Sequence, residues 1–378
     1  MTVVEELHEA HGATFEERGG RRVVRDYGRP AVAHRAVRNG AGIIEMGYGV
    51  VVVEGDDRVA FVDNTVSNRV PDDDGEGVYA LLLDPQGRVE TDMYVYNAGE
   101  RLLCFTPPDR AEPLADDWAE KVFVQDVSVR EASGEFGIFG VHGPKSTEKV
   151  ASVLKNAAAP EPAMTFDRGV VGGEGVTVIA NDGLTGDEGY EVVCTADAAE
   201  RVFDTLLTQG SGAAPFGYAT WESLTAEAGT PLFETELSGR LPNVLGVRNA
   251  VDFEKGCFVG QEVVSKVENR GQPSSRLVGL AVEELPAAGD AVLAGDDEVG
   301  EVTRATEGPS VGSPIALAVV EYDLDPSATL SVRVGVDDGG DDGAETVEAT
   351  RETLPFYEGT AVSARVPTYL EDEASEAE

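Results

Sequence analysis

The chain has 378 residues, which is more than one hydrophobic core usually serves, so two or three domains are expected. It carries 70 Asp and Glu residues against 29 Lys and Arg residues, a formal net charge of −41, and such a field repels nucleic acids and anionic membranes. No run of about 18 apolar residues occurs, and the N-terminus lacks the basic and apolar regions of a signal peptide, so we expect a soluble, cytoplasmic protein.

The first half of the chain mixes helices and strands. A helix is expected at residues 3–10, a β-branched strand at 48–55, and a helix at 56–67 that Asp56 would cap. Two strands, 78–83 and 88–96, form a hairpin around Asp84-Pro85-Gln86-Gly87. The remaining elements are a helix at 145–154, after Gly143-Pro144, and strands at 175–180 and 190–194.

The pattern changes near residue 272, where helical periodicity ends. Short strands follow at close spacing, which favours a small all-β barrel: 276–285, 291–295, 298–306, 314–324 and 329–336. The acidic stretches 337–345 and 371–378 predict a solvated loop and a disordered tail.

The acidic residues are spread along the whole chain rather than confined to one tail. This pattern is typical of proteins from salt-loving organisms, and a cationic partner is the alternative explanation. A halophilic protein loses structure on dialysis into low salt, which separates the two.

Asp92 is an unusual carboxylate in the middle of a strand, flanked by aromatic residues. A two-residue turn places Tyr79 directly opposite Asp92, a phenol beside a carboxylate. A three-residue turn with Gly87 in a bulge places Ala80 there instead, because Pro85 does not take the positive φ that two-residue turns prefer. An exposed strand carboxylate without a function is the third possibility for Asp92.

The glycine-rich segment NDGLTGDEGYE (181–191) ends with Glu191 at the start of a strand. A carboxylate there could accept paired hydrogen bonds from the amide edge of a ligand, although a surface turn explains the same residues. The local acids and the absence of a P-loop lysine exclude a phosphate cradle.

Hydrolase and metal chemistry have little support. The sequence contains no HExxH or GxSxG motif, no GxGxxG in a strand–helix context and no CxxC pair. The separated cysteines argue against a disulfide framework and indicate a reducing compartment; they are Cys104, Cys194 and Cys257. The histidines form no ligand cluster in the sequence; they are His8, His11, His34 and His142.

The stretch KGCFVGQE (255–262) combines a cation, a thiol and two glycines. Lys255 could lower the pKa of Cys257 and make it a nucleophile, but no histidine lies nearby in the sequence to act as its base. A tight structural turn over Gly256 and Gly260 with a buried cysteine is the alternative. Gln261 and Glu262 could pair with the lysine or begin a helix.

Several segments together resemble the aminomethyltransferase (T-protein) family of the glycine cleavage system. LHEAHGATFEERGG and YGRPAVAHRAVRNGAG resemble its N-terminus, and VYALLLDPQGRVETDMYVY resembles its folate-site hairpin. NDGLTGDEGYEV is similar to TGYTGEDGFE, SLTAEAGTPLF to LRLEAGLPLY, and GPSVGSPIALAVV with TLPFYEG to its C-terminal barrel. KGCFVGQE is instead similar to the KGCYTGQE motif of YgfZ, a folate-binding relative linked to iron–sulfur cluster maintenance.

The resemblance implies an α+β fold with three domains in a ring and tetrahydrofolate in the central channel. Residues 1–49 and 141–272 would form a discontinuous folate-binding domain, and 50–140 a second α+β domain with Tyr79 and Asp92. The barrel would span 273–367, followed by an acidic tail at 368–378. The loop 255–262 would close one wall of the channel near the barrel.

The resemblance also implies roles for single residues. Asp92 matches the catalytic aspartate, Tyr79 a folate-contacting tyrosine, and Glu191 the glutamate that binds the pterin ring. Trp221 stands where the family has a ligand-contacting arginine; an indole keeps a stacking surface but loses a bidentate partner for a carboxylate. IIEMGYG replaces the family's DVSHMG, and FTPPDR replaces a stretch containing VNA.

The leading functional hypothesis is a tetrahydrofolate-dependent one-carbon transferase, whose partner is a small-molecule amine donor or a lipoylated carrier protein. The alternative, implied by the YgfZ-like loop, is a non-catalytic folate-binding protein that supports iron–sulfur enzymes. A scaffold that binds nothing is the third hypothesis. No nucleic acid, membrane or metal is expected.

Overall fold

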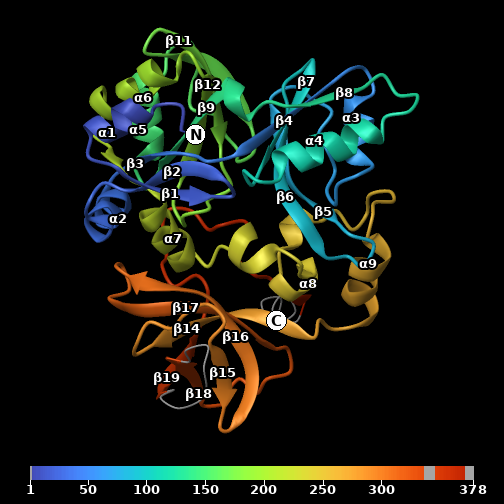
Figure 1. Cartoon of the computed structure of the whole chain (residues 1–378), viewed down its shortest axis with the longest axis vertical. Coiled ribbons are helices and arrows are strands. Elements are labelled where there is room, and N and C mark those ends of the chain that lie inside the picture. Colours follow the sequence, from blue (N-terminus) through green and yellow to red (C-terminus); the bar gives the residue numbers. More distant parts are fainter. Residues whose placement is uncertain (1, 336–344, 371–378) are drawn as a thin grey trace.

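The computed structural model describes residues 2–335 and 345–370. Two mixed α+β units lie side by side, and a β-barrel lies below them in the view of Figure 1. This architecture confirms the predicted fold class. Within these residues, no helix combines the length and the apolar character that crossing a membrane requires.

The first unit is built on a six-stranded sheet in which β13 and β3 are the one parallel pair of neighbouring strands and all other neighbours are antiparallel. In sheet order its strands are β10 (Phe166–Val171), β11 (Glu174–Ala180), β12 (Gly189–Thr195), β9 (Phe136–His142), β3 (Gly42–Glu45) and β13 (Ala214–Pro215). Helices α5 (Ser146–Val153) and α6 (Ala199–Thr208) pack on one face. Val176 and Val178 join this helix-covered core, whereas Ile179 faces the central core, as the alternation of a strand requires.

The second unit is built on a five-stranded sheet, β5 (Glu76–Leu83), β6 (Val89–Asn97), β7 (Arg101–Thr106), β4 (Gly49–Glu54) and β8 (Ser128–Glu131). Helices α3 (Arg58–Asp63) and α4 (Ala111–Glu120) pack on one face. In β4, Val51 and Val53 join the core under these helices, and Val50 and Val52 join the central core. Both faces of this strand are buried, which explains its unbroken run of valines.

Helix α3 is shorter than the predicted helix at 56–67. It begins after Asp57 rather than Asp56, and no side chain caps its N-terminus. The carboxylate of Asp57 instead accepts the amide of Asp126, at 2.8 Å. The helix ends early because the amide of Ser67 donates to the carbonyl of Leu81 in β5, at 2.9 Å.

The hairpin β5–β6 has the predicted three-residue turn with Gly87 at φ +78°. Farther along, the pairing shifts by one residue and leaves Glu90 as the extra residue of a bulge. Leu81 therefore faces Asp92. Both predicted registers, which placed Tyr79 or Ala80 opposite Asp92, are wrong, because nothing in the sequence marks this second bulge.

The barrel closes through six antiparallel strands: β14 (Ser275–Val282), β17 (Ser313–Glu321), β16 (Asp297–Gly308), β15 (Ala291–Ala294), β18 (Leu330–Val334) and β19 (Glu345–Glu352). Strand β19 was not among the predicted strands, because only Val347 and Ala349 point inward among charged neighbours. The predicted loop 337–345, apart from its last residue, and the predicted tail 371–378 lie outside the described residues.

Several short elements lie outside the two large sheets and the barrel. They are α1 (Glu5–Ala10), β1 (Thr14–Arg18), β2 (Arg21–Asp26), α2 (Pro30–Asn39), η1 (Ser133–Glu135), α7 (Tyr218–Glu227), η2 (Phe233–Leu237), α8 (Pro242–Leu245), η3 (Arg248–Ala250) and α9 (Gln261–Arg270). Helix α7 contacts α2, β2 and the barrel strand β16, and therefore joins the first unit to the barrel. The predicted domain boundaries stay a prediction, and the one between residues 140 and 141 falls inside β9.

Candidate functional site

A cavity of about 140 Å³ lies where the two α+β units meet α7, η2 and the barrel. Its aromatic walls are Tyr48, Tyr94, Phe105, Tyr218, Trp221 and Phe233. Its charged residues are Arg18, Asp92, Glu222, Glu234, Arg304 and Arg365. Of the residues predicted for ligand contact or catalysis, Asp92 and Trp221 line this cavity, while Tyr79 and Glu191 lie beside residues that do.

Tyr79 and Asp92 form the predicted phenol–carboxylate pair, although they are diagonal rather than directly opposite in the hairpin. The hydroxyl of Tyr79 donates to Oδ2 of Asp92 at 2.9 Å, and both side chains are buried. A diagonal pair on one face of a hairpin is within reach of a tyrosine side chain. The bulge at Glu90 thus changed the register without separating the two groups.

Arg365 completes this cluster and carries no marker in the sequence beyond a single cation within SARVPTYL. It follows the barrel, and its Nη1 donates to Oδ2 of Asp92 at 3.2 Å. Its guanidinium also donates to the hydroxyl of Tyr94 and lies 3.7 Å above the ring of Tyr79. Burial raises the pKa of Asp92, and the positive charge of Arg365 and the hydrogen bond from Tyr79 oppose that shift.

Glu191 lies in β12 and is buried. Its side chain is 2% exposed, and neither carboxylate oxygen has a hydrogen-bond partner in the part of the chain that the structure describes. Burial, helped by the nearby charge of Asp182, raises its pKa to about 8. Oδ1 of Asp182 accepts the hydroxyl of Tyr94 at 2.8 Å, and its Oδ2 has no hydrogen bond among the described residues but forms an ion pair with Nε of Arg365 at 3.6 Å. Buried acceptors without a hydrogen bond are costly and rare, so those of Glu191 need an explanation.

Trp221 lies on α7 with its indole in the cavity wall. Behind it, the ring of His142 packs edge-on at 5.1 Å between centroids. His142 is fully buried, which lowers its pKa to about 3, so the imidazole is neutral at physiological pH. The wall at this point is therefore aromatic and uncharged.

The loop 255–262 lies outside the cavity: none of its eight residues is among the lining residues. Its predicted place in a channel wall stays a prediction. The loop packs closely against the tip of the β5–β6 hairpin at Gly260. A Cβ atom at this position would lie 2.7 Å from the carbonyl oxygen of Asp84 and 2.9 Å from Cα of Gly87, so only glycine fits. Helix α9 begins at Gln261, as one of the predicted alternatives had it.

Lys255 and Cys257 point to different surroundings. The ammonium of Lys255 is buried and donates to the carbonyls of Asp63, Val66 and Asn68 at 2.6 to 3.1 Å. Lys255 therefore fastens this loop to the end of α3. Cys257 is exposed, so the predicted turn with a buried cysteine is wrong in that detail.

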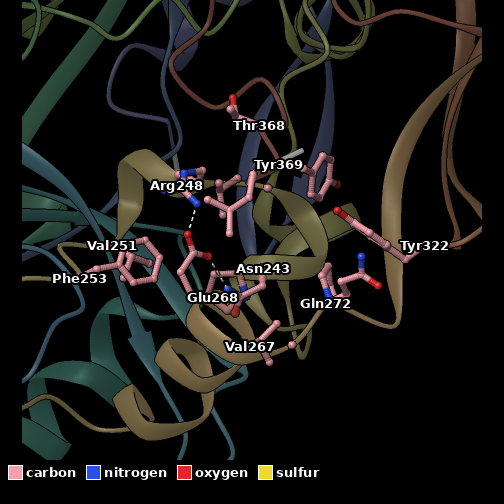
Figure 2. Close-up of a pocket in the computed structure, with 16 residues that line it drawn as sticks. Asn243, Arg248, Val251, Phe253, Val267, Glu268, Gln272, Tyr322, Thr368 and Tyr369 are labelled. Carbon is pink, nitrogen blue, oxygen red and sulfur yellow. Dashed lines mark hydrogen bonds and ion pairs between the residues drawn. The ribbon is translucent and has the colours of Figure 1, made fainter. Parts of the chain in front are cut away.

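A second cavity of about 240 Å³ lies between α8, α9 and the barrel. Figure 2 shows Glu268 at its centre, paired with Arg248 and accepting a hydrogen bond from Asn243 at 3.1 Å. Tyr322 and Tyr369 line its other side. None of the predicted site residues lines this larger cavity, so the smaller one is the candidate functional site.

Family models and curated relatives match nearly the whole length of the chain. Residues 4–255 match the model of the GCVT N-terminal domain, and residues 276–358 match that of the glycine cleavage T-protein C-terminal barrel domain. A curated aminomethyltransferase from Saccharopolyspora erythraea is 31% identical over 373 residues, which cover 96% of this chain and 99% of the relative. One from Bacillus subtilis is 28% identical over 340 residues, which cover 86% and 92%.

The fold has a solved counterpart. The crystal structure of the glycine cleavage system aminomethyltransferase T from Bartonella henselae matches with a TM-score of 0.82 at 21% identity, covering 95% of this chain and 98% of that one. At this identity the likeness concerns the fold, and it includes both α+β units and the barrel.

Proposed function

Because the chain belongs to the glycine cleavage T-protein (aminomethyltransferase) family, we propose that it is a tetrahydrofolate-dependent one-carbon transferase whose catalytic carboxylate is Asp92. The observation that carries this proposal is the buried cluster of Asp92, Tyr79 and Arg365 at the edge of an aromatic cavity. A carboxylate kept in such a setting at the cost of its hydration is typical of a functional site.

The buried acceptors near the cavity fit a pterin. Both oxygens of Glu191 and Oδ2 of Asp182 lack hydrogen-bond partners among the described residues. The pterin ring of tetrahydrofolate presents adjacent N–H donors along one edge, and a carboxylate accepts such a pair in a bidentate manner. Glu191 lies close to this cavity, because its ionised form would raise the pKa of the lining residue Tyr48 beyond the effect of burial.

Asp92 is placed to hold and move one proton. When bound, tetrahydrofolate supplies the amine nitrogens that take up the one-carbon unit. Oδ2 of Asp92 is fixed by Tyr79 and Arg365, which orients the carboxylate toward the cavity that it lines. Burial raises the pKa of Asp92, which favours its uptake of a proton.

The donor of the one-carbon unit is a small-molecule amine in this proposal, in preference to a lipoylated carrier protein. The supporting observation is the uncharged wall of Trp221 and His142, which gives no guanidinium to the ligand at that point. The aromatic face of Trp221 can attract a methylated ammonium group. The neighbouring rings of Tyr218 and Phe233 already have a guanidinium over them, that of Arg18 at 4.6 Å and that of Arg110 at 5.2 Å.

Titration calorimetry at high salt tests the proposal directly. The wild type is expected to bind tetrahydrofolate and to turn over with an amine donor such as sarcosine or dimethylglycine. Asp92→Asn should abolish turnover and keep folate binding within a few-fold. Glu90→Gln, an exposed carboxylate in the same strand, is the matched control and should keep full activity. A fully active Asp92→Asn variant, or no binding of tetrahydrofolate, contradicts the proposal.

One observation favours a second candidate function, a folate-binding protein that supports iron–sulfur enzymes. Cys257 is exposed at a YgfZ-like loop whose lysine is fixed by buried contacts. In that case Cys257→Ser should lower the activity of iron–sulfur enzymes in cells, while Asp92→Asn should not. Unchanged activities in a strain that lacks the gene refute this candidate.

A further inference from the structure

Arg304 reaches the candidate site from the barrel because of a bulge in β16. The pairing with β17 shifts between Val302 and Arg304, which leaves Thr303 as the extra residue. The hydroxyl of Thr303 donates to the carbonyl of Leu317 at 3.0 Å and fixes the bulge. Bulges redirect the side chains that follow them, and here the following side chain is a lining residue of the cavity.

The guanidinium of Arg304 is held in place but not fully used. Nη1 donates to the hydroxyl of Thr225 at 2.9 Å, and Nη2 donates to the carbonyl of Thr230 at 2.6 Å. Glu236 forms an ion pair with it at 3.4 Å. The residue is only 6% exposed, and its buried Nε has no partner among the described residues. An unpaired donor on a buried cation is costly unless a ligand satisfies it.

Each arginine of the cavity has carboxylates beside it. Arg365 faces those of Asp92 and Asp182. Arg304 faces Glu236, and the nearby Arg18 pairs with Glu16, Glu222 and Glu234. The Nε of Arg304, which has no partner among the described residues, can donate to an anionic oxygen of a ligand, whereas the end of the cavity at Asp92 is suited to an amine.

We propose that Arg304 binds a carboxylate group of the substrate and so sets the direction in which the substrate lies, with its amine toward Asp92. This inference rests on the proposed folate-dependent transfer. The carboxylate has two candidate sources, the glutamyl part of tetrahydrofolate and an amino-acid donor.

Paired ligands with and without a carboxylate test the role of Arg304. Tetrahydrofolate is compared with tetrahydropteroate, which lacks the glutamyl part, and sarcosine and dimethylglycine with methylamine and dimethylamine. For the relevant pair, Arg304→Gln should weaken binding of the carboxylate-bearing ligand about tenfold or more and leave its partner unchanged. Calorimetry at high salt measures both, and the pair that responds identifies the source of the carboxylate.

Two further variants separate recognition from folding. The double variant Arg304→Gln with Glu236→Gln removes both buried charges, so no unpaired carboxylate remains, and it should show the same selective loss. Arg333→Gln changes the net charge equally from barrel strand β18 and should bind every ligand like the wild type. Equal weakening within both ligand pairs, or no weakening in either, overturns the inference. If the wild type binds amino acids but no tetrahydrofolate, the proposed function fails while the role of Arg304 is still decided by the amino-acid pair.

Discussion

Replacing Glu191 with glutamine removes a buried carboxyl group that has no hydrogen-bond partner within residues 2–335 and 345–370. Its pKa rises from the ordinary 4.5 to about 8, because burial disfavours the charged form and Asp182 adds a negative charge nearby. Between these two pH values, folded Glu191 keeps a proton that the unfolded chain has released. The free energy of unfolding therefore decreases as pH rises from about 4.5 to about 8 and is constant, for this group, outside that window.

The size of this effect follows from the pKa difference. At about 1.4 kcal/mol per pKa unit, ionising Glu191 costs up to about 5 kcal/mol of stability by pH 8. Glutamine has nearly the same size and does not titrate. If the glutamine amide lacks a hydrogen bond, the free energy of unfolding changes by the same amount at every pH. The slope of the free energy of unfolding against pH is therefore the diagnostic quantity.

Chemical unfolding at fixed high salt, from pH 5 to pH 9, measures this slope. The difference in unfolding free energy between Glu191→Gln and the wild type should grow in favour of the variant as pH rises to about 8 and level off above it. Glu90→Gln, which removes an exposed carboxylate, should follow the wild type at every pH. Parallel curves for the wild type and Glu191→Gln would refute the assignment of a protonated, buried glutamate.

Two more outcomes follow from single contacts. Tyr79→Phe removes a hydrogen bond that lowers the pKa of Asp92, so this pKa should rise. The acidic limb of the pH–rate profile, measured with saturating substrate, should then move to higher pH. If the limb does not move, Asp92 is not the titrating group. Lys255→Met leaves three carbonyls without their donor and should lower the free energy of unfolding by about 2 to 4 kcal/mol in a denaturant titration. Lys121→Met, at an exposed ion pair, should change it by less than about 0.5 kcal/mol. Equal effects of the two variants would contradict the proposal that Lys255 fixes the loop to the end of α3.

The fold was predictable where the pattern is local. The valines of β4 and the alternation of β11 define strands by themselves, and the turn at Gly87 was predictable from its glycine. The register of the β5–β6 hairpin was not, because the bulge at Glu90 depends on how the strand packs rather than on any turn residue. Strand β19 was hidden by its charged outer face, as expected for an acidic surface.

The site shows the same division. Asp92 and Trp221 could be placed at the cavity because they lie within segments that resemble a known family. Arg365 and Arg304 could not, since each reaches the cavity from the C-terminal part of the chain through tertiary contacts. The prediction that Lys255 could activate Cys257 rested on their closeness in the sequence. The structure instead shows that Lys255 donates a hydrogen bond to the carbonyl of Asp63, at the distant end of α3.

The bond between Asp92 and Arg365 joins residues that are 273 positions apart. During synthesis, the hairpin with Asp92 leaves the ribosome long before the arginine does. The segment that follows the barrel therefore supplies the counter-charge of the site, and a chain that is cut short after the barrel would leave the buried carboxylate of Asp92 without the cation of Arg365.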